Sequence, residues 1–179
     1  KEDELKAFLI RLPNIPDSTT PIGSSEEENV FYKDWGSKPS FNFDPKFHYE
    51  IGENSNLMNF ETATKLSGPR FVILKGQLSK LERAIANFML DKHTSSNGYV
   101  EMHVPYLVKE ETLYGTGQLP KFAEDLFTAG DDHWLIPTAE VPLTSLCSNQ
   151  ILNINQLPMR VTSYTPCFRS EAGAAGKDT

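Results

Sequence analysis

Apolar residues recur at three- and four-residue steps over residues 77–93. This spacing places their side chains on one face of an α-helix, and it predicts the longest helix of the chain. The residues on that face are Leu78, Leu81, Ile85, Phe88, Met89 and, at its end, Lys92. Gly76 precedes the predicted helix and the turn-forming pair Asn97-Gly98 follows it, so both ends are marked by residues that interrupt helices.

Shorter patterns predict the remaining elements. Helical spacing predicts a helix in residues 1–12, stopped by Pro13, and a second over 59–66, with Asn59 as its N-cap and Gly68 as its stop. Strands are predicted at 30–35, 70–74, 99–108 (bent at Pro105), 134–137 and 158–168. A short helix is predicted at 141–148, loops at 115–117 and 172–179, and a surface strand or loop within the aromatic-rich stretch 39–52. Because helices and strands mix without a regular βαβ rhythm, we expect an α+β fold on an antiparallel sheet.

Composition narrows the function classes. The 179 residues carry 17 Lys and Arg against 24 Asp and Glu, a net charge of −7, which argues against a general nucleic-acid binder but leaves a local basic patch open. The two cysteines show no C-x-x-C spacing, which excludes a zinc ribbon and favours a reduced, cytosolic protein; one disulfide remains the alternative. No apolar run approaches the roughly 18 residues of a membrane span. No signal peptide is visible, although a removed targeting sequence stays open because the chain begins at Lys1.

The segment 165–179 (TPCFRSEAGAAGKDT) carries the main chemical signal. A strand would deliver Arg169 and Glu171 to one face, two residues apart. The planar guanidinium suits phosphate or carboxylate, and glutamate accepts hydrogen bonds from amino groups. Taken alone, the pair is explained more simply as a surface salt bridge. The glycines before Lys177 do not form a P-loop, because they are too closely spaced and Asp178 stands where that motif has Ser or Thr.

A second polar group, Thr138-Ala139-Glu140, lies in WLIPTAEVPLT, where a predicted strand turns into a helix. Here Thr138 can hydrogen-bond a small polar ligand, and Glu140 can pair with an ammonium group. The same residues also suit a threonine N-cap with an acidic first turn, which stabilises a helix without any ligand.

Other residues give weaker signals. The four histidines lack metal-ligand spacing, so no metal site is predicted. Ser170 lacks the G-x-S-x-G context of a hydrolase nucleophile. Cys167 lies in a predicted strand, which favours a small core residue over a nucleophile.

Several segments, in order along the chain, resemble the seryl-tRNA synthetases, which are class II aminoacyl-tRNA synthetases. They are LPNIP (12–16), GTGQLPKFAEDLF (115–127), WLIPTAEVPLT (134–144) and TPCFRSEAGAAGKDT (165–179). Each string alone is a weak signal, but their ordered combination is specific and covers nearly the whole chain.

The resemblance implies a class II catalytic core, an antiparallel β-sheet flanked by helices, and it assigns roles to residues. Helix 77–93 and strand 99–108 would form motif 1, which builds a homodimer interface, and 165–179 would form motif 2. The triplet Thr138, Ala139 and Glu140 would bind L-serine. The triplet Arg169, Ser170 and Glu171 would contact ATP, with Arg169 as the catalytic group. Residues 1–12 would end an N-terminal helical arm, 13–40 would form a connector with the first strand of the catalytic domain, and 41–179 the catalytic domain through the motif 2 loop.

The implied activity is that of a serine–tRNA ligase, which joins L-serine to tRNA(Ser) through seryl-adenylate, using ATP and Mg²⁺. A further acceptor, tRNA(Sec), stays open. We expect a cytoplasmic protein, with a mitochondrial location as the alternative, and no membrane partner. Two other readings are a non-catalytic paralogue used for binding or dimerisation, and an enzyme that aminoacylates a carrier protein. Because motif 3 and a second serine-contacting glutamate have no counterpart, we expect an incomplete catalytic domain that is inactive by itself.

Overall fold

The structure is a computed structural model that describes residues 1–170, and the chain divides into two units, of which the first is Lys1–Phe47 and the second begins at His48. In the first unit, the helix α1 (Glu2–Leu9) and the 3-10 turn η1 (Glu26–Glu28) are joined by irregular chain, and every residue is exposed. The predicted helix forms, but it ends at Leu9 rather than running to Leu12. The prediction of a strand at 30–35 is wrong, because these residues pair with no neighbouring strand to satisfy their backbone groups.

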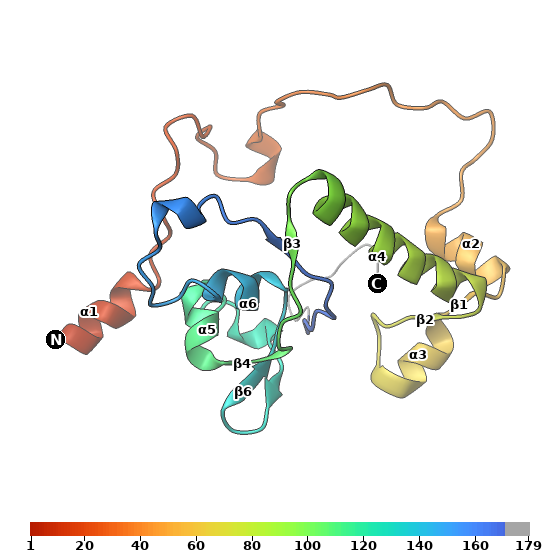
Figure 1. Ribbon diagram of the computed structural model, residues 1–179. Helices are drawn as coiled ribbons and strands as arrows, with labels where there is room; N and C mark the ends of the chain where they lie inside the picture. The colour runs from red at the N-terminus through yellow and green to blue at the C-terminus, as the bar shows by residue number, and fades with distance from the viewer. Residues whose placement is uncertain (171–179) are drawn as a thin grey trace. The chain divides into compact units, whose positions relative to one another are not determined.

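The second unit begins with α2 (His48–Asn54), so the aromatic-rich stretch is a loop followed by a helix. Next, β1 (Met58–Asn59) pairs antiparallel with β2 (Ile73–Leu74). Of the strand predicted at 70–74, only these last two residues, 73 and 74, form a strand. These two strands flank α3 in the sequence, and their pairing brings the chain that enters the helix beside the chain that leaves it (Figure 1).

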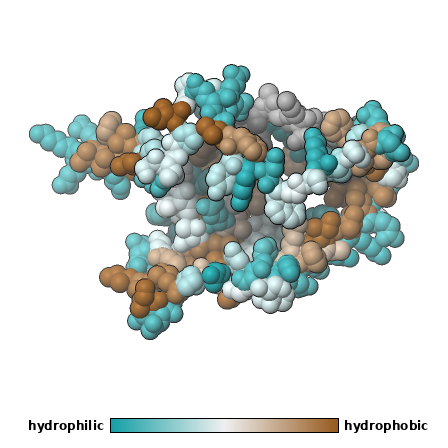
Figure 2. Space-filling view, turned by 90° about the horizontal axis from the view of Figure 1, so that it is seen from above, coloured by the Kyte–Doolittle hydropathy of each residue, from teal (hydrophilic) through white to brown (hydrophobic). Residues whose placement is uncertain are grey.

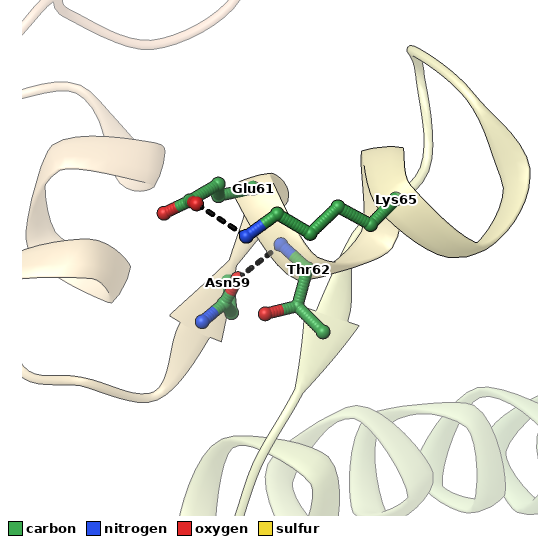
Figure 3. Close-up of polar contacts among 4 residues, drawn as sticks. All are labelled: Asn59, Glu61, Thr62 and Lys65. Atoms are coloured by element: carbon green, nitrogen blue, oxygen red, sulfur yellow. Dashed lines mark hydrogen bonds and ion pairs between the residues drawn. The ribbon is translucent and has the colours of Figure 1, made fainter.

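Helix α3 (Phe60–Ser67) confirms the predicted caps. The side chain of Asn59 accepts a hydrogen bond from the Thr62 backbone N–H at 2.7 Å, and Gly68 ends the helix with a φ of 91° (Figure 3). On the exposed surface of the helix, Lys65 Nζ lies 2.6 Å from a carboxylate oxygen of Glu61. The cap satisfies a backbone donor that no intrahelical carbonyl can reach.

Helix α4 (Gln77–Ser96) is the long helix predicted from the apolar spacing, extended by one turn. Most of the predicted face does not turn toward the rest of the chain. Its members Leu81, Ile85, Phe88 and Met89 are exposed and only Leu78 is half-buried, whereas Ala86, Leu90 and Thr94 on a neighbouring face are half-buried as well. The helix is therefore apolar on two neighbouring faces, and the more hydrophobic one contributes to the apolar side chains that lie at the surface. Such residues appear in brown in Figure 2.

The single strand predicted at 99–108 forms two short strands, β3 (Val100–Glu101) and β4 (Leu107–Lys109), because Pro105 has no N–H to continue a ladder. The strand predicted at 158–168 reduces to β7 (Val161–Thr162), which pairs with β3 in parallel rather than antiparallel (Figure 1). A 3-10 turn, η3 (Ile154–Gln156), precedes β7.

The core lies around an antiparallel sheet with the strand order β4–β6–β5, where β5 is Thr128–Ala129 and β6 is His133–Leu135. Helices α5 (Glu110–Gly115) and α6 (Glu140–Ser145) and the 3-10 turn η2 (Ala123–Asp125) belong to the same region. Because α5 includes Gly115, the loop predicted at 115–117 begins at Thr116, one residue later than predicted. The buried cluster is Val108, Leu113, Leu119, Leu126, Ile136 and Val141, with Tyr106 and Trp134 packed against it. Within residues 1–170, no helix is long and apolar enough to cross a membrane.

Candidate functional site

Arg169 is attached to the backbone directly beyond the end of β6. Its Nε donates to the carbonyl oxygen of Pro137 at 3.0 Å. One residue earlier, the Phe168 N–H donates to the Ile136 carbonyl at 2.9 Å, so the segment carrying Arg169 runs alongside the buried pair Ile136-Pro137. Ile136 is fully buried in the core. The segment that carries Arg169 is therefore hydrogen-bonded to a well-packed part of the chain.

Arg169 lines a cavity of about 790 Å³. Phe71, Val72 and Phe127 give this cavity apolar surface, and a second arginine, Arg70, lies in its wall. No acidic residue is among its described lining residues. Because the Arg169 Nε–H is engaged by Pro137, the terminal nitrogens remain as donors in a fixed plane, an arrangement that suits a phosphate or carboxylate group.

Arg70 belongs to this site, and nothing in the sequence pattern pointed to it. Its Nη1 donates to the carbonyl oxygen of Ser170 at 3.4 Å, across 100 positions of the chain. Its φ of 70° is a left-handed value that non-glycine residues adopt uncommonly and that often accompanies functional sites. The preceding Gly68-Pro69 pair is a turn signal, but a turn signal does not reveal a partner so distant in sequence.

Thr138, Ala139 and Glu140 form the entry to α6. Ala139, not Thr138, is the N-cap residue, and the Thr138 Oγ1 accepts from the Glu140 N–H at 3.3 Å. The threonine therefore supports the first turn from one position further back than predicted. Val141 and Pro142 directly after the triplet are buried, which anchors this turn to the core.

The three residues differ in exposure. Thr138 and Ala139 are half-buried and Glu140 is exposed. Glu140 lines a cavity of about 550 Å³ together with Thr144, Cys147, Met159 and Thr162. Arg169 does not line this cavity, so the structure joins the arginine to the triplet through Pro137 and places Arg169 and Glu140 in separate hollows. Glu171 and the loop 172–179 lie outside the described residues.

Ser170 is bound to η2. Its hydroxyl donates to the Glu124 carbonyl at 2.7 Å, and its N–H donates to the Asp125 carbonyl at 3.0 Å. These two hydrogen bonds connect the segment 115–127 to the segment 165–170 at the site. No sequence pattern assigned a role to Glu124 or Asp125.

Tyr164 connects the same C-terminal segment to α4. Its hydroxyl donates to Glu82 Oε1 at 3.2 Å. This hydrogen bond, the negative charge of Glu82 and a small loss of hydration raise the pKa of the Tyr164 phenol above its ordinary value of 10.0.

The described residues contain no group of three or more His, Cys, Asp or Glu side chains arranged to hold a metal ion. Both cysteines are free, so the alternative of a disulfide is not realised in the structure. Cys167 is exposed, and its prediction as a core residue is wrong because the strand expected there does not form.

Sequence comparison finds relatives along almost the entire chain. A serine–tRNA ligase of Sinorhizobium fredii is 56% identical over 178 residues, which are 99% of this chain and 42% of that protein. A serine–tRNA ligase of Ehrlichia ruminantium is 57% identical over 177 residues, again 99% of this chain and 42% of the relative. The family profile of the tRNA synthetase class II core domain (G, H, P, S and T) matches residues 124–178.

Two solved structures share the fold. A seryl-tRNA synthetase from Pyrococcus horikoshii in complex with ATP superposes with a TM-score of 0.88 at 32% identity, covering 99% of this chain and 44% of that one. A cytoplasmic serine–tRNA ligase from Naegleria fowleri in complex with AMP gives a TM-score of 0.87 at 27% identity, with coverages of 99% and 42%. The chain spans about two fifths of the length of the curated relatives it matches. By its sequence and its α+β fold of helices and mostly antiparallel sheets, the chain belongs to the seryl-tRNA synthetase family and has the class II aminoacyl-tRNA synthetase core fold.

Proposed function

We propose that the intact protein is a serine–tRNA ligase, which activates L-serine with ATP and transfers the seryl group to tRNA(Ser). The observation that carries this proposal is the hydrogen bond from Arg169 to Pro137. It fastens the arginine expected to meet the phosphate group to the residue directly before the triplet expected to bind serine. The two reactants must be held in one relative orientation to react. Binding groups that are fixed to the same stretch of backbone favour this orientation.

The serine side of the proposal rests on Thr138, Ala139 and Glu140. The Thr138 hydroxyl accepts a hydrogen bond from the Glu140 N–H, so its proton remains available for a ligand oxygen. The exposed carboxylate of Glu140 can pair with the ammonium group of serine, and Ala139 is small enough for close approach of the ligand. A site that hydrogen-bonds the serine hydroxyl discriminates strongly against alanine, because an unfilled polar site is costly.

On the ATP side, Arg169 would contact the α-phosphoryl group, and Glu171 would accept from the adenine amino group. The cavity beside Arg169 offers the apolar surfaces of Phe71 and Phe127 for the flat base. We propose that Mg²⁺ enters the site bound to the phosphates of ATP.

In this proposal, the serine carboxylate attacks the α-phosphorus, pyrophosphate leaves, and seryl-adenylate forms. Negative charge develops on the α-phosphoryl oxygens, and the terminal nitrogens of Arg169, held in place through Nε, would stabilise it. No covalent protein nucleophile is needed. The seryl group then passes to the terminal adenosine of tRNA(Ser), and tRNA(Sec) is a second acceptor to be tried in the same charging assay.

We also propose a homodimer built on α4 and the strand region that follows it. Its support is the exposed apolar face of α4, where the side chains of Leu81, Phe88 and Met89 are 52%, 67% and 55% exposed. A hydrophobic patch of this kind is typical of a surface that another protein covers. We propose a cytoplasmic location, which cell fractionation would distinguish from a mitochondrial one. The division at residues 12, 40 and 41 into arm, connector and catalytic domain stays a proposal.

The deciding experiment is amino-acid-dependent ATP–pyrophosphate exchange with the purified intact protein. We expect exchange with L-serine and at least about a hundredfold less with L-alanine, because alanine leaves the hydroxyl-binding groups unpaired. Charging of tRNA(Ser) but not of a carrier protein would complete the assignment. An intact, folded protein with no serine-dependent exchange would refute the proposal.

A further inference from the structure

Ser170 directly follows Arg169 and donates two hydrogen bonds to a distant segment. Its hydroxyl donates to the Glu124 carbonyl at 2.7 Å, across 46 positions of the chain, and its backbone N–H donates to the Asp125 carbonyl at 3.0 Å. Both acceptors are backbone groups of η2, which leads into the buried residue Leu126. Ser170 thus ties the end of the Arg169 segment to a part of the chain that is anchored in the core.

This geometry changes the role expected for Ser170. A hydroxyl has one proton, and while that proton is donated to Glu124, the oxygen can only accept. The phosphates of ATP and the carboxylate of serine also only accept. Ser170 therefore cannot bond either group without giving up its short contact to η2.

Arg169 lies between two backbone attachments. On one side, the Phe168 N–H is bonded to the Ile136 carbonyl, and on the other, Ser170 is bonded to η2. Between them, the Arg169 side chain has its own bond from Nε to Pro137. A long side chain loses conformational entropy when it is held in one rotamer. Because the backbone on both sides of Arg169 is already fixed, less of this entropy has to be lost when a ligand binds.

From these contacts we propose that Ser170 is a positioning residue: its hydroxyl fastens the Arg169 segment to η2 and so holds the guanidinium at the phosphate position. This inference rests on the proposed serine-activating function. The contact from Arg70 Nη1 to the Ser170 carbonyl, at 3.4 Å, adds a third polar attachment at the same residue. Each polar group of Ser170 thus contacts protein, which fits a residue that acts through its neighbour.

The test compares Ser170→Thr with Ser170→Val in the intact protein. Threonine and valine have the same shape and both suit extended backbone, so the pair differs in the hydroxyl alone. We expect Ser170→Thr to keep at least about half of the wild-type kcat for serine-dependent ATP–pyrophosphate exchange. Ser170→Val should lose about fivefold or more in kcat, the size expected for one hydrogen bond, while the KM for ATP stays within about twofold.

A matched control is Ser55→Ala. The Ser55 hydroxyl also donates to a backbone carbonyl, that of Ile51, at 2.8 Å, but it does so at the end of α2. Its loss should leave kcat unchanged. If hydroxyl–carbonyl bonds mattered only for general stability, Ser55→Ala and Ser170→Val would act alike.

Three results would overturn the inference in an active wild-type protein. They are an unchanged kcat in Ser170→Val, a rise in the KM for ATP with kcat unchanged, which would indicate direct contact with ATP, or equal loss in the threonine and valine variants. Absence of exchange in the wild-type protein would instead refute the proposed function, so the two failures are distinguishable. If Ser170→Val alone is too unstable to assay, a Ser170→Thr variant with a fivefold loss would still contradict the inference.

Discussion

Arg169 and Pro137 are joined by a hydrogen bond from the arginine Nε to the proline carbonyl at 3.0 Å. Proline cannot donate from its own nitrogen, but its carbonyl is a full acceptor, and here the residue is buried in the turn between β6 and α6. The bond uses the one guanidinium donor that stands nearest the backbone. Because the guanidinium is planar, this bond also fixes the plane in which the two terminal nitrogens lie.

Replacing Arg169 by lysine should therefore be nearly as damaging as replacing it by alanine. An ammonium group has no Nε–H to bond Pro137 while a second nitrogen contacts the ligand. We expect kcat for serine-dependent exchange to fall by about a hundredfold or more. Steady-state exchange kinetics measure this, with Arg160→Lys as the control, since Arg160 is an exposed arginine of the same segment. Wild-type kcat in Arg169→Lys would contradict the role given to the Nε bond.

The exposed apolar face of α4 predicts the behaviour of a charge placed on it. Phe88→Glu introduces a carboxylate where a dimer would bury an aromatic ring, and we expect the protein to sediment as a monomer. Asn87→Glu puts the same charge on the adjacent, exposed position outside the apolar face and should leave the dimer intact. Sedimentation velocity distinguishes the species, and a wild-type monomer at micromolar concentration would refute this interface.

The core around Leu113 should respond to the loss of side-chain volume. Leu113 is 0% exposed, so Leu113→Ala removes buried methyl groups and leaves a cavity. The free energy of unfolding should fall by about 2–5 kcal/mol. In Leu66→Ala, where the leucine is 73% exposed on α3, the change should stay within about 0.5 kcal/mol. Urea unfolding followed by circular dichroism measures both, and equal losses would show that Leu113 is not a core residue.

The cap of α3 allows a comparison between a hydrogen bond and an ion pair. Asn59→Ala removes the acceptor of the Thr62 N–H and should lower the free energy of unfolding by about 1 kcal/mol, whereas Asn59→Asp should retain it. Lys65→Met breaks the ion pair with Glu61, whose side chains are 69% and 81% exposed, and should cost less than about 0.5 kcal/mol. The reverse order in urea unfolding would contradict the importance given to the cap.

Tyr164 should show a pH dependence with a definite sign. Because its phenol pKa is raised above 10.0 in the folded protein, the bond to Glu82 stabilises the fold below that pH and is lost as the pH rises through the raised value. NMR titration of carbon-13-labelled tyrosine should find this pKa above that of an unperturbed tyrosine. Glu82→Gln, which removes the charge, should lower it again. A Tyr164 pKa that does not respond to Glu82→Gln would exclude this carboxylate as the cause.

Local patterns predicted local structure well. The ends of α3 follow from Asn59 and Gly68, whose caps act on neighbouring backbone groups, and the start of α4 follows directly after Gly76, without a side-chain cap. The strands were predicted less well, because pairing requires a partner that alternation does not identify. The run 30–35 has no partner and is not a strand, and only Val161–Thr162 of the long run before Arg169 is paired.

The apolar spacing of α4 shows the limit of such patterns in one helix. The spacing correctly identified the helix and an apolar face, yet that face is exposed at every apolar position but Leu78, and a neighbouring face is half-buried. A hydrophobic stripe has the same sequence signature whether the same chain or another molecule covers it. Only the packed structure distinguishes the two.

The sequence by itself determined which polar groups this protein presents, namely the threonine–alanine–glutamate turn and the arginine beside a serine, and it determined the helices that local caps define. The tertiary structure alone decided what those groups contact. Arg169 meets Pro137 across 32 positions, and Ser170 meets Glu124 across 46. Contacts over such separations depend on the path of the whole chain around its core, and the residue types at their ends do not reveal that path.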